Sequence, residues 1–235
     1  MISPIVRLAT RLNYRFGIRS LTKAENGVEY RTYNLYESQE PMVSEILSNI
    51  GSNDVVYDIG AHQGRYCLPL AQRAKSVHAF EPHPVVFNRL KKNIKINRGD
   101  VTASNLGVGD TAGSLTFYHS SDPQRSSFNE YNASYSGAKI ERTSSIDVKT
   151  LDDYVQEHEP PDILKIDAEG FGIEILRGGK ELIKANDPEI YLELHEIDDG
   201  KARDAELREL MDSWAYSLTK RSAGRWTVHP KSEQQ

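Results

Sequence analysis

The stretch Asp58-Ile59-Gly60-Ala61-His62-Gln63-Gly64 decides the fold of this chain. It closes a short apolar run over residues 55–59, which predicts a buried strand, and it opens residues 64–73, which predict a helix. Glycine at such a turn lets the backbone bend sharply and approach a ligand where a Cβ would collide. A strand, a glycine turn and a helix in this order predict the ligand-binding turn of an α/β sheet.

The turn differs from the glycine fingerprint of nicotinamide-binding sheets. With Gly60 as the middle glycine of G-x-G-x-x-G, the outer positions hold Asp58 and Gln63. Asp58 could hold the ammonium group of a ligand whose carboxylate lies at the helix start, where free N–H groups favour an anion. A second acid, Glu81, ends the next predicted strand, residues 77–80, where a carboxylate can accept both hydroxyls of a ribose. The two acids therefore predict one shared ligand site.

Strand-like and helical stretches alternate beyond residue 54, which predicts a mostly parallel sheet covered by helices on both faces. Residues 114–118 and 144–148 predict an inserted β-hairpin, and the polar residues 120–143 between them predict a mobile loop or a substrate lid. Residues 216–220 and 226–229 predict a closing antiparallel hairpin. This ending is typical of a methyltransferase sheet. The expected fold is α/β and Rossmann-like, with seven strands.

Four ordered segments resemble the FkbM family of methyltransferases: residues 58–64, 77–84, 150–154 and 164–170. The resemblance covers about residues 50–200 and implies the class I methyltransferase fold, S-adenosylmethionine as cofactor, and methyl transfer to an oxygen atom of a sugar, glycan or polyketide. Carried over position by position, it implies these cofactor-binding residues: Asp58, Gly60, Ala61, Gly64, Glu81, Pro82, Asn105 and Asp167. The family often has an acid where Gly172 stands, which leaves a non-catalytic cofactor- or glycan-binding subunit as an alternative. The second alternative function is that of a nicotinamide-dependent sugar oxidoreductase.

An alcohol acceptor is a weak nucleophile that a base would activate by about 10²–10⁴-fold, whereas a carboxylate acceptor needs no base. Lys165 and Asp167 share one face of a strand, as Glu193 and His195 do, because side chains alternate along strands. We expect these four catalytic residues to point into one cleft, with His195 as the base because its ordinary pKa lies near neutrality. Asp167, Glu169, Glu193 and His195 could instead hold a divalent metal, but no diagnostic ligand spacing exists, so no metal is predicted.

The remaining histidines are expected to face solvent or lie in loops: His62, His78, His83, His119, His158 and His229. Cys67 is the only cysteine, so no intramolecular disulfide can form, and we expect it in the core. No run of about eighteen apolar residues, the length of a spanning helix, occurs. With no secretory signal at its start, the chain is expected to be a cytoplasmic enzyme.

The net charge of −5 is unevenly distributed. Residues 1–24 contain five cations and no acid, so the remainder carries −10, which argues against a nucleic-acid substrate. The cations recur every four residues and predict a basic stripe on a helix: Arg7, Arg11, Arg15, Arg19 and Lys23. We expect a basic helical extension over residues 1–45 and an S-adenosylmethionine-binding methyltransferase domain over residues 46–235. The helix either contacts the inner face of a membrane or packs on the domain or a second subunit.

Overall fold

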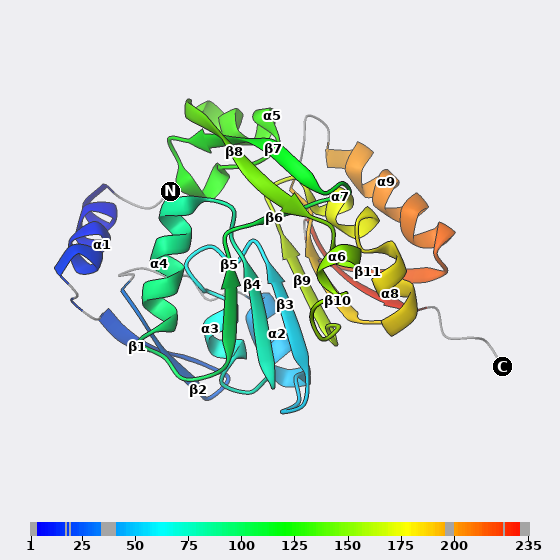
Figure 1. Ribbon diagram of the computed structural model, residues 1–235, viewed down its shortest axis with the longest axis horizontal. Coiled ribbons are helices and arrows are strands. Elements are labelled where there is room, and N and C mark those ends of the chain that lie inside the picture. Colours follow the sequence, from blue (N-terminus) through cyan, green and yellow to red (C-terminus); the bar gives the residue numbers. More distant parts are fainter. Residues whose placement is uncertain are drawn as a thin grey trace.

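The computed structural model describes residues 4–16, 18, 20–33, 41–195, 200–222 and 224–230. Its main element is a seven-stranded sheet with the order β11-β12-β10-β9-β3-β4-β5 (Figure 1). Five neighbouring strands run parallel: β10(Glu189–Glu193), β9(Ile163–Asp167), β3(Val55–Ile59), β4(Ser76–Phe80) and β5(Val101–Ser104). β12(Arg225–Pro230) pairs antiparallel with both β10 and β11(Tyr216–Ser222). The predicted α/β sheet with its C-terminal antiparallel hairpin is therefore confirmed.

Each face of the sheet has its own apolar core, because successive side chains of a strand point to opposite faces. Val55 and Tyr57 of β3 belong to one core, and Val56 between them belongs to the other. The helices that cover the first face are α6(Leu151–Tyr154), α7(Gly172–Arg177), α8(Lys180–Asn186) and α9(Gly200–Ser213). Those on the second face are α2(Pro41–Asn49), α3(Cys67–Leu70) and α4(Pro84–Ile94), and Cys67 is buried there as expected.

A small second sheet, with the order β6-β8-β7, lies above the carboxyl ends of the parallel strands (Figure 1). It consists of β6(Gly107–Val108), β7(Gly113–Ser120) and β8(Ile140–Lys149), and β7 and β8 form the predicted inserted hairpin. The polar stretch between them holds three short helical turns: η1(Pro123–Arg125), α5(Glu130–Ser134) and η2(Tyr135–Gly137). This stretch closes the pocket described below from above.

The N-terminal segment differs from the long basic helix that the spacing of cations predicts. α1(Pro4–Phe16) ends well before Lys23, which lies in β1(Ser20–Glu25), while Arg19 lies outside the described residues. β1 forms a hairpin with β2(Val28–Thr32), and Val28 and Tyr30 are buried in the same core as α2. The four-residue spacing of the cations wrongly predicted a helix that reaches Lys23, because this spacing carries no information about the hairpin turn at Asn26-Gly27, where both residues adopt a positive φ. No helix in the described ranges has the length and apolar character needed to cross a membrane.

Candidate active site

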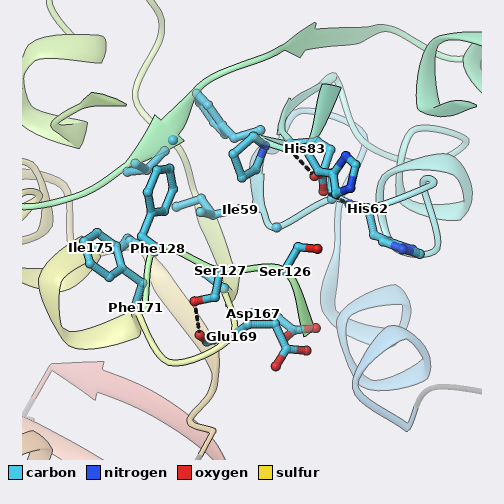
Figure 2. A pocket seen from close by; sticks show the side chains of 18 of the residues that line it. Ile59, His62, His83, Ser126, Ser127, Phe128, Asp167, Glu169, Phe171 and Ile175 are labelled. Atoms are coloured by element: carbon cyan, nitrogen blue, oxygen red, sulfur yellow. Dashed lines mark hydrogen bonds between the residues drawn. The ribbon is translucent and has the colours of Figure 1, made fainter. Parts of the chain in front are cut away.

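A pocket of about 270 Å³ opens at the carboxyl ends of β3, β4, β9 and β10, below the inserted sheet (Figure 2). Its apolar walls include Phe80, Leu106, Phe117, Phe128, Phe171 and Ile175. Its polar lining includes predicted site residues from three strand ends: Glu81, Asp167, Glu193 and His195. Open α/β sheets bind their ligands at this edge.

The glycine turn lines the pocket through Gly60 and Ala61. Both backbone N–H groups donate to the Phe80 carbonyl oxygen, at 3.0 Å and 2.9 Å. Gly60 has a φ of +77°, and a Cβ there would overlap the Asp167 carbonyl oxygen, so only glycine fits between the two strand ends. Gly64 does not line the pocket, because its position faces Leu68 of the following helix. Its predicted role in cofactor contact is therefore replaced by a role in closing the turn.

Glu81 is held in the pocket by two backbone groups. Its Oε2 accepts from His62 N at 2.8 Å and its Oε1 accepts from His83 N at 2.7 Å. Burial raises the pKa of Glu81 to about 7, although both N–H groups favour the charged form. Pro82 lines the pocket beside it, whereas Asn105 stands behind, with its amide donating to the Glu81 and Pro82 carbonyl oxygens at 2.8 Å and 2.9 Å. Asn105 therefore supports the turn and does not line the pocket.

Asp58 and Lys165 form a buried ion pair below the glycine turn. Lys165 Nζ lies 2.9 Å from Asp58 Oδ1 and donates to the carbonyl oxygens of Ile59 and Gly60 at 3.2 Å and 3.0 Å. The other Asp58 oxygen accepts from Cys67 N at 3.0 Å. Neither side chain lines the pocket, since both are fully buried below the turn. The contact of Asp58 with a ligand's ammonium group and the catalytic role of Lys165 stay predictions. The alternation of side chains predicted that Lys165 and Asp167 share one face of β9. It could not predict that Asp58 of the neighbouring strand β3 lies opposite Lys165 and pairs with it.

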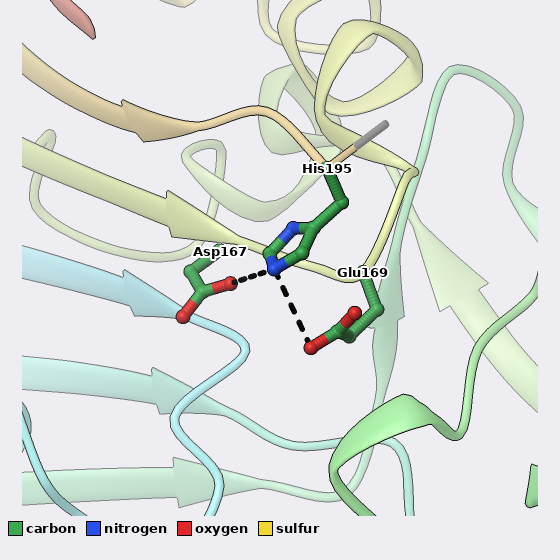
Figure 3. A group of neighbouring side chains, drawn as sticks. All are labelled: Asp167, Glu169 and His195. Carbon is green, nitrogen blue, oxygen red and sulfur yellow. Dashed lines mark ion pairs between the residues drawn. The ribbon is translucent and has the colours of Figure 1, made fainter. Parts of the chain in front are cut away.

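Three carboxylates lie within 4.0 Å of one imidazole nitrogen at the ends of β9 and β10, and Figure 3 shows two of them, Asp167 and Glu169, beside His195. His195 Nε2 lies 3.5 Å from Glu169 Oε1, 3.6 Å from Asp167 Oδ1 and 4.0 Å from Glu193 Oε1. Burial alone would lower the pKa of His195, but the three carboxylates outweigh it and raise this pKa. The structure thus brings together Asp167, Glu169, Glu193 and His195, the four residues that the sequence analysis grouped as possible metal ligands.

The backbone around this cluster is constrained. Glu169 has a φ of +41°, a strained conformation for a residue with a side chain, and its carbonyl oxygen accepts from Ser127 Oγ at 2.7 Å. Burial raises the pKa of Glu169 to about 7, while the nearby His195 opposes the rise. Arg225 Nε lies 3.1 Å from Glu193 Oε2 and partly neutralises that carboxylate.

The same cluster is the one group among the described residues that could offer three ligand atoms to a metal ion. One atom each of Asp167, Glu169 and His195 lies within 4.8 Å of the others. The arrangement can therefore hold either a proton on His195 or a small cation between the side chains.

Several histidines contradict the expectation that they face solvent. His78, His83 and His119 are buried, and the rings of His83 and His119 meet edge to face with centroids 4.7 Å apart beside the pocket. Burial lowers the pKa of His83 to about 4 and that of His62 to about 3, so both rings are neutral at neutral pH. His83 Nδ1 also caps α4 by accepting from Val85 N at 3.2 Å. Proline at the first position of that helix was the signal that could have identified His83 as its cap.

The strand order, with an antiparallel strand between the last two parallel ones, and the pocket at the carboxyl ends define the class I, Rossmann-like methyltransferase fold. The chain belongs to the FkbM methyltransferase family, because the family model for the Methyltransferase FkbM domain matches residues 58–218.

Relatives of known description agree with this family. The chain is 26% identical over 180 residues to the hexuronic acid methyltransferase AglP of Haloferax volcanii, covering 75% of this chain and 68% of AglP. It is 28% identical over 165 residues to the methyltransferase sdnD of Sordaria araneosa, covering 57% of this chain and 64% of sdnD. The crystal structure of methyltransferase FkbM from Methylobacillus flagellatus KT has the same fold, with a TM-score of 0.52 and 15% identity, over 77% of this chain and 44% of that one.

Proposed function

We propose that this protein is an S-adenosylmethionine-dependent O-methyltransferase that acts on a sugar hydroxyl or a hexuronate carboxylate of a glycan. The observation that carries the proposal is that Glu81 and the cluster around His195 line the same pocket; Figure 2 shows Asp167 and Glu169 of this cluster in it. The Glu81 carboxylate suits the ribose of a nucleoside, and the cluster around His195 suits an acceptor oxygen. The cofactor half and the acceptor half of a methyl-transfer site would therefore share one cavity.

The residues present fit the cofactor. Glu81 keeps free lone pairs for two ribose hydroxyls, since each of its oxygens accepts only one backbone N–H bond. The buried Nε2 of His62 has no hydrogen-bond partner among the described residues, and it lines the pocket beside Glu81. Leu106 and Phe128 add apolar surface for an adenine ring. When bound, S-adenosylmethionine supplies an activated methyl group on its sulfonium.

The task left to the protein is to align an acceptor oxygen and to remove its proton. His195 lines the pocket and its Nε2 points toward Asp167 and Glu169 (Figure 3), so neutral His195 can accept a proton and the carboxylates stabilise the resulting imidazolium. Alignment in a near-attack geometry can contribute about 7–11 kcal/mol to such a reaction. We therefore assign His195 as the base and the carboxylates as its positioning partners. A hexuronate acceptor would react as a carboxylate and would not need this base.

A carbohydrate acceptor is supported by the name of the relative AglP, which is a hexuronic acid methyltransferase. The acidic charge around His195 argues that the acceptor oxygen is a hydroxyl, because a carboxylate would be repelled by Asp167 and Glu169 unless these were protonated. We therefore favour a sugar hydroxyl over a hexuronate carboxylate.

Calorimetric titration with S-adenosylmethionine and S-adenosylhomocysteine tests the cofactor. Both should bind, Glu81→Ala should weaken both, and NADH should give no heat. Methyl transfer to a set of sugars and uronates then tests the reaction, with His195→Gln expected to bind the cofactor normally and to turn over at least about a hundredfold more slowly on hydroxyl acceptors. Absence of cofactor binding, or a heat signal with NADH alone, would contradict the proposal.

A further inference from the structure

Helix α1 carries an apolar stripe that the rest of the described protein does not cover. Leu8, Leu12 and Phe16 are spaced by four residues, so they lie along one side of the helix. Their exposed fractions are 58%, 40% and 66%, and Ile18 just beyond the helix is 55% exposed. The chain therefore has a row of four exposed large apolar side chains. A single exposed apolar side chain is ordinary, but a row of four needs an explanation.

The helix is attached to the domain by a different side. Asn13 is buried, and its amide donates to the Tyr33 carbonyl oxygen at 3.1 Å. The Ile18 N–H donates to the Asn13 carbonyl oxygen at 3.1 Å and places Ile18 next to the end of the helix. Asn13 lies about 100° around the helix from Leu12, so this attachment leaves the apolar stripe outward. Of the three alternatives that the sequence left open, packing of this side on the domain does not apply to Leu8, Leu12 and Phe16, which are exposed.

Three cations border a groove beside the stripe. Arg15 borders a surface groove between α1 and α4, together with Val85, Asn88, Arg89 and Lys92. Figure 1 shows α1 beside α4, at the edge of the molecule away from α8 and α9. The sequences of α1 and α4 contain six cations and no acid, in a chain with a net charge of −5. This separation of charge marks the face formed by the two helices as a binding surface for an anion-rich partner.

The nature of the partner follows from combining the two features. A second copy docked through the same face in a two-fold contact would bring these cations against one another. A nucleic acid would use the cations and would leave the apolar stripe exposed to water. An anionic lipid bilayer satisfies both, because apolar side chains insert between acyl chains while arginine and lysine contact the headgroups.

We propose that α1 and the side of α4 that carries Val85, Arg89 and Lys92 form a membrane-docking face for an anionic bilayer. Leu8, Leu12, Phe16 and Ile18 insert, and Arg15, Arg89 and Lys92 contact lipid headgroups. The face adjoins the pocket, because α4 begins at Pro84, directly after the pocket residue His83. A bilayer on this face would lie near the part of the pocket that His83 lines, so a lipid-linked acceptor could be supplied from it. The docking itself is independent of methyl transfer.

The experiment is flotation of the full-length protein with two kinds of vesicle. One contains phosphatidylcholine alone, and the other contains about 30% of the anionic lipid phosphatidylglycerol in addition. The protein should float with the anionic vesicles only, and binding should fall as salt rises. Leu8→Ser/Leu12→Ser/Phe16→Ser should abolish flotation. Arg89→Gln/Lys92→Gln should weaken partitioning about 25-fold, at roughly fivefold per cation. Point variants are preferable to truncation, since removal of residues 1–33 would also remove the buried Val28 and Tyr30.

Two matched controls accompany these variants. Leu115→Ser removes an exposed apolar side chain from β7, and Lys180→Gln removes an exposed cation from α8. Both should float as the unaltered protein does, and all variants should keep its melting temperature. Equal flotation of the stripe variant and Leu115→Ser would overturn the proposal, as would absence of flotation with anionic vesicles. Light scattering that shows a dimer abolished by the stripe variant, with vesicle binding unchanged, would assign the face to a second copy instead.

Discussion

Replacing Lys165 by methionine should be among the most damaging single changes in the core. The substitution keeps most of the side-chain volume and removes the charge. Asp58 would then remain fully buried with the Cys67 N–H as its donor, and the carbonyl oxygens of Ile59 and Gly60 would lose their shared donor. Removal of one partner from a buried ion pair typically costs about 3–5 kcal/mol, so we expect a loss of unfolding free energy in this range.

Urea unfolding at pH 7.5, followed by circular dichroism, measures this loss. The matched control is Lys75→Met, which breaks the ion pair with Glu159 at 2.6 Å, where both side chains are about half exposed. That change should cost no more than about 1 kcal/mol, because water screens exposed pairs. The double variant Asp58→Asn/Lys165→Met removes the stranded charge, so it should be more stable than Lys165→Met alone.

The pH dependence sharpens the prediction. Without Lys165, burial raises the pKa of Asp58 in the folded state above its unfolded value. The folded variant then binds an extra proton, so its stability relative to the unaltered protein should fall as pH rises from about 4 and recover as pH falls. Lys165→Met and Lys75→Met with equal losses, or a deficit independent of pH, would refute the view that this ion pair organises the glycine turn.

Four further outcomes follow from the site. The rate on a hydroxyl acceptor should rise with pH through a midpoint above 6.5, because the pKa of His195 is raised and only its neutral form accepts a proton; a rate independent of pH, or a profile unchanged in His195→Gln, would contradict this. S-adenosylmethionine should release more protons on binding at pH 7 than S-adenosylhomocysteine, which lacks the sulfonium charge, because the sulfonium disfavours the imidazolium of His195 and the protonated form of Glu169, whose pKa is about 7; calorimetry in two buffers of different ionisation enthalpy measures the difference, which should vanish only when His195→Gln and Glu169→Gln are combined. Gly60 and Gly27 have nearly the same φ, +77° and +76°, but only Gly60 lacks room for a Cβ. Thermal unfolding should therefore show a loss of stability of about 1–2 kcal/mol for Gly27→Ala and roughly 1–3 kcal/mol more for Gly60→Ala. Turnover should persist after dialysis against EDTA, and a requirement for added Mg²⁺ or Mn²⁺ would assign Asp167 and its neighbours to a metal instead.

The sheet was predictable because its strands follow simple patterns. The glycine turn at residues 58–64 and the closing hairpin at residues 216–229 depend on local residue types, and both lie where the sequence placed them. The N-terminal hairpin was not predictable from the spacing of cations, since that spacing continues through the turn at Asn26-Gly27 without a change of period. The exposure of Leu8 and Phe16 could not be predicted from the sequence either, because it depends on which side of α1 contacts the domain.

The site was predictable at the level of strand ends but not of contacts. Alternation along β9 and β10 correctly brought Asp167, Glu193 and His195 to one edge. It could not show that Asp58 and Lys165 neutralise each other below the turn, because the pairing joins neighbouring strands that are 107 residues apart in sequence. The sequence also grouped Glu169 with these residues, but it did not show that Glu169 adopts a positive φ.

A crystal structure of the protein with S-adenosylhomocysteine tests the central claim most directly. The account predicts that the ribose hydroxyls hydrogen-bond to the Glu81 carboxylate and that the sulfur atom faces the side of the pocket where Asp167 and His195 lie. A ligand bound away from Glu81, or a sulfur atom directed away from His195, would contradict it.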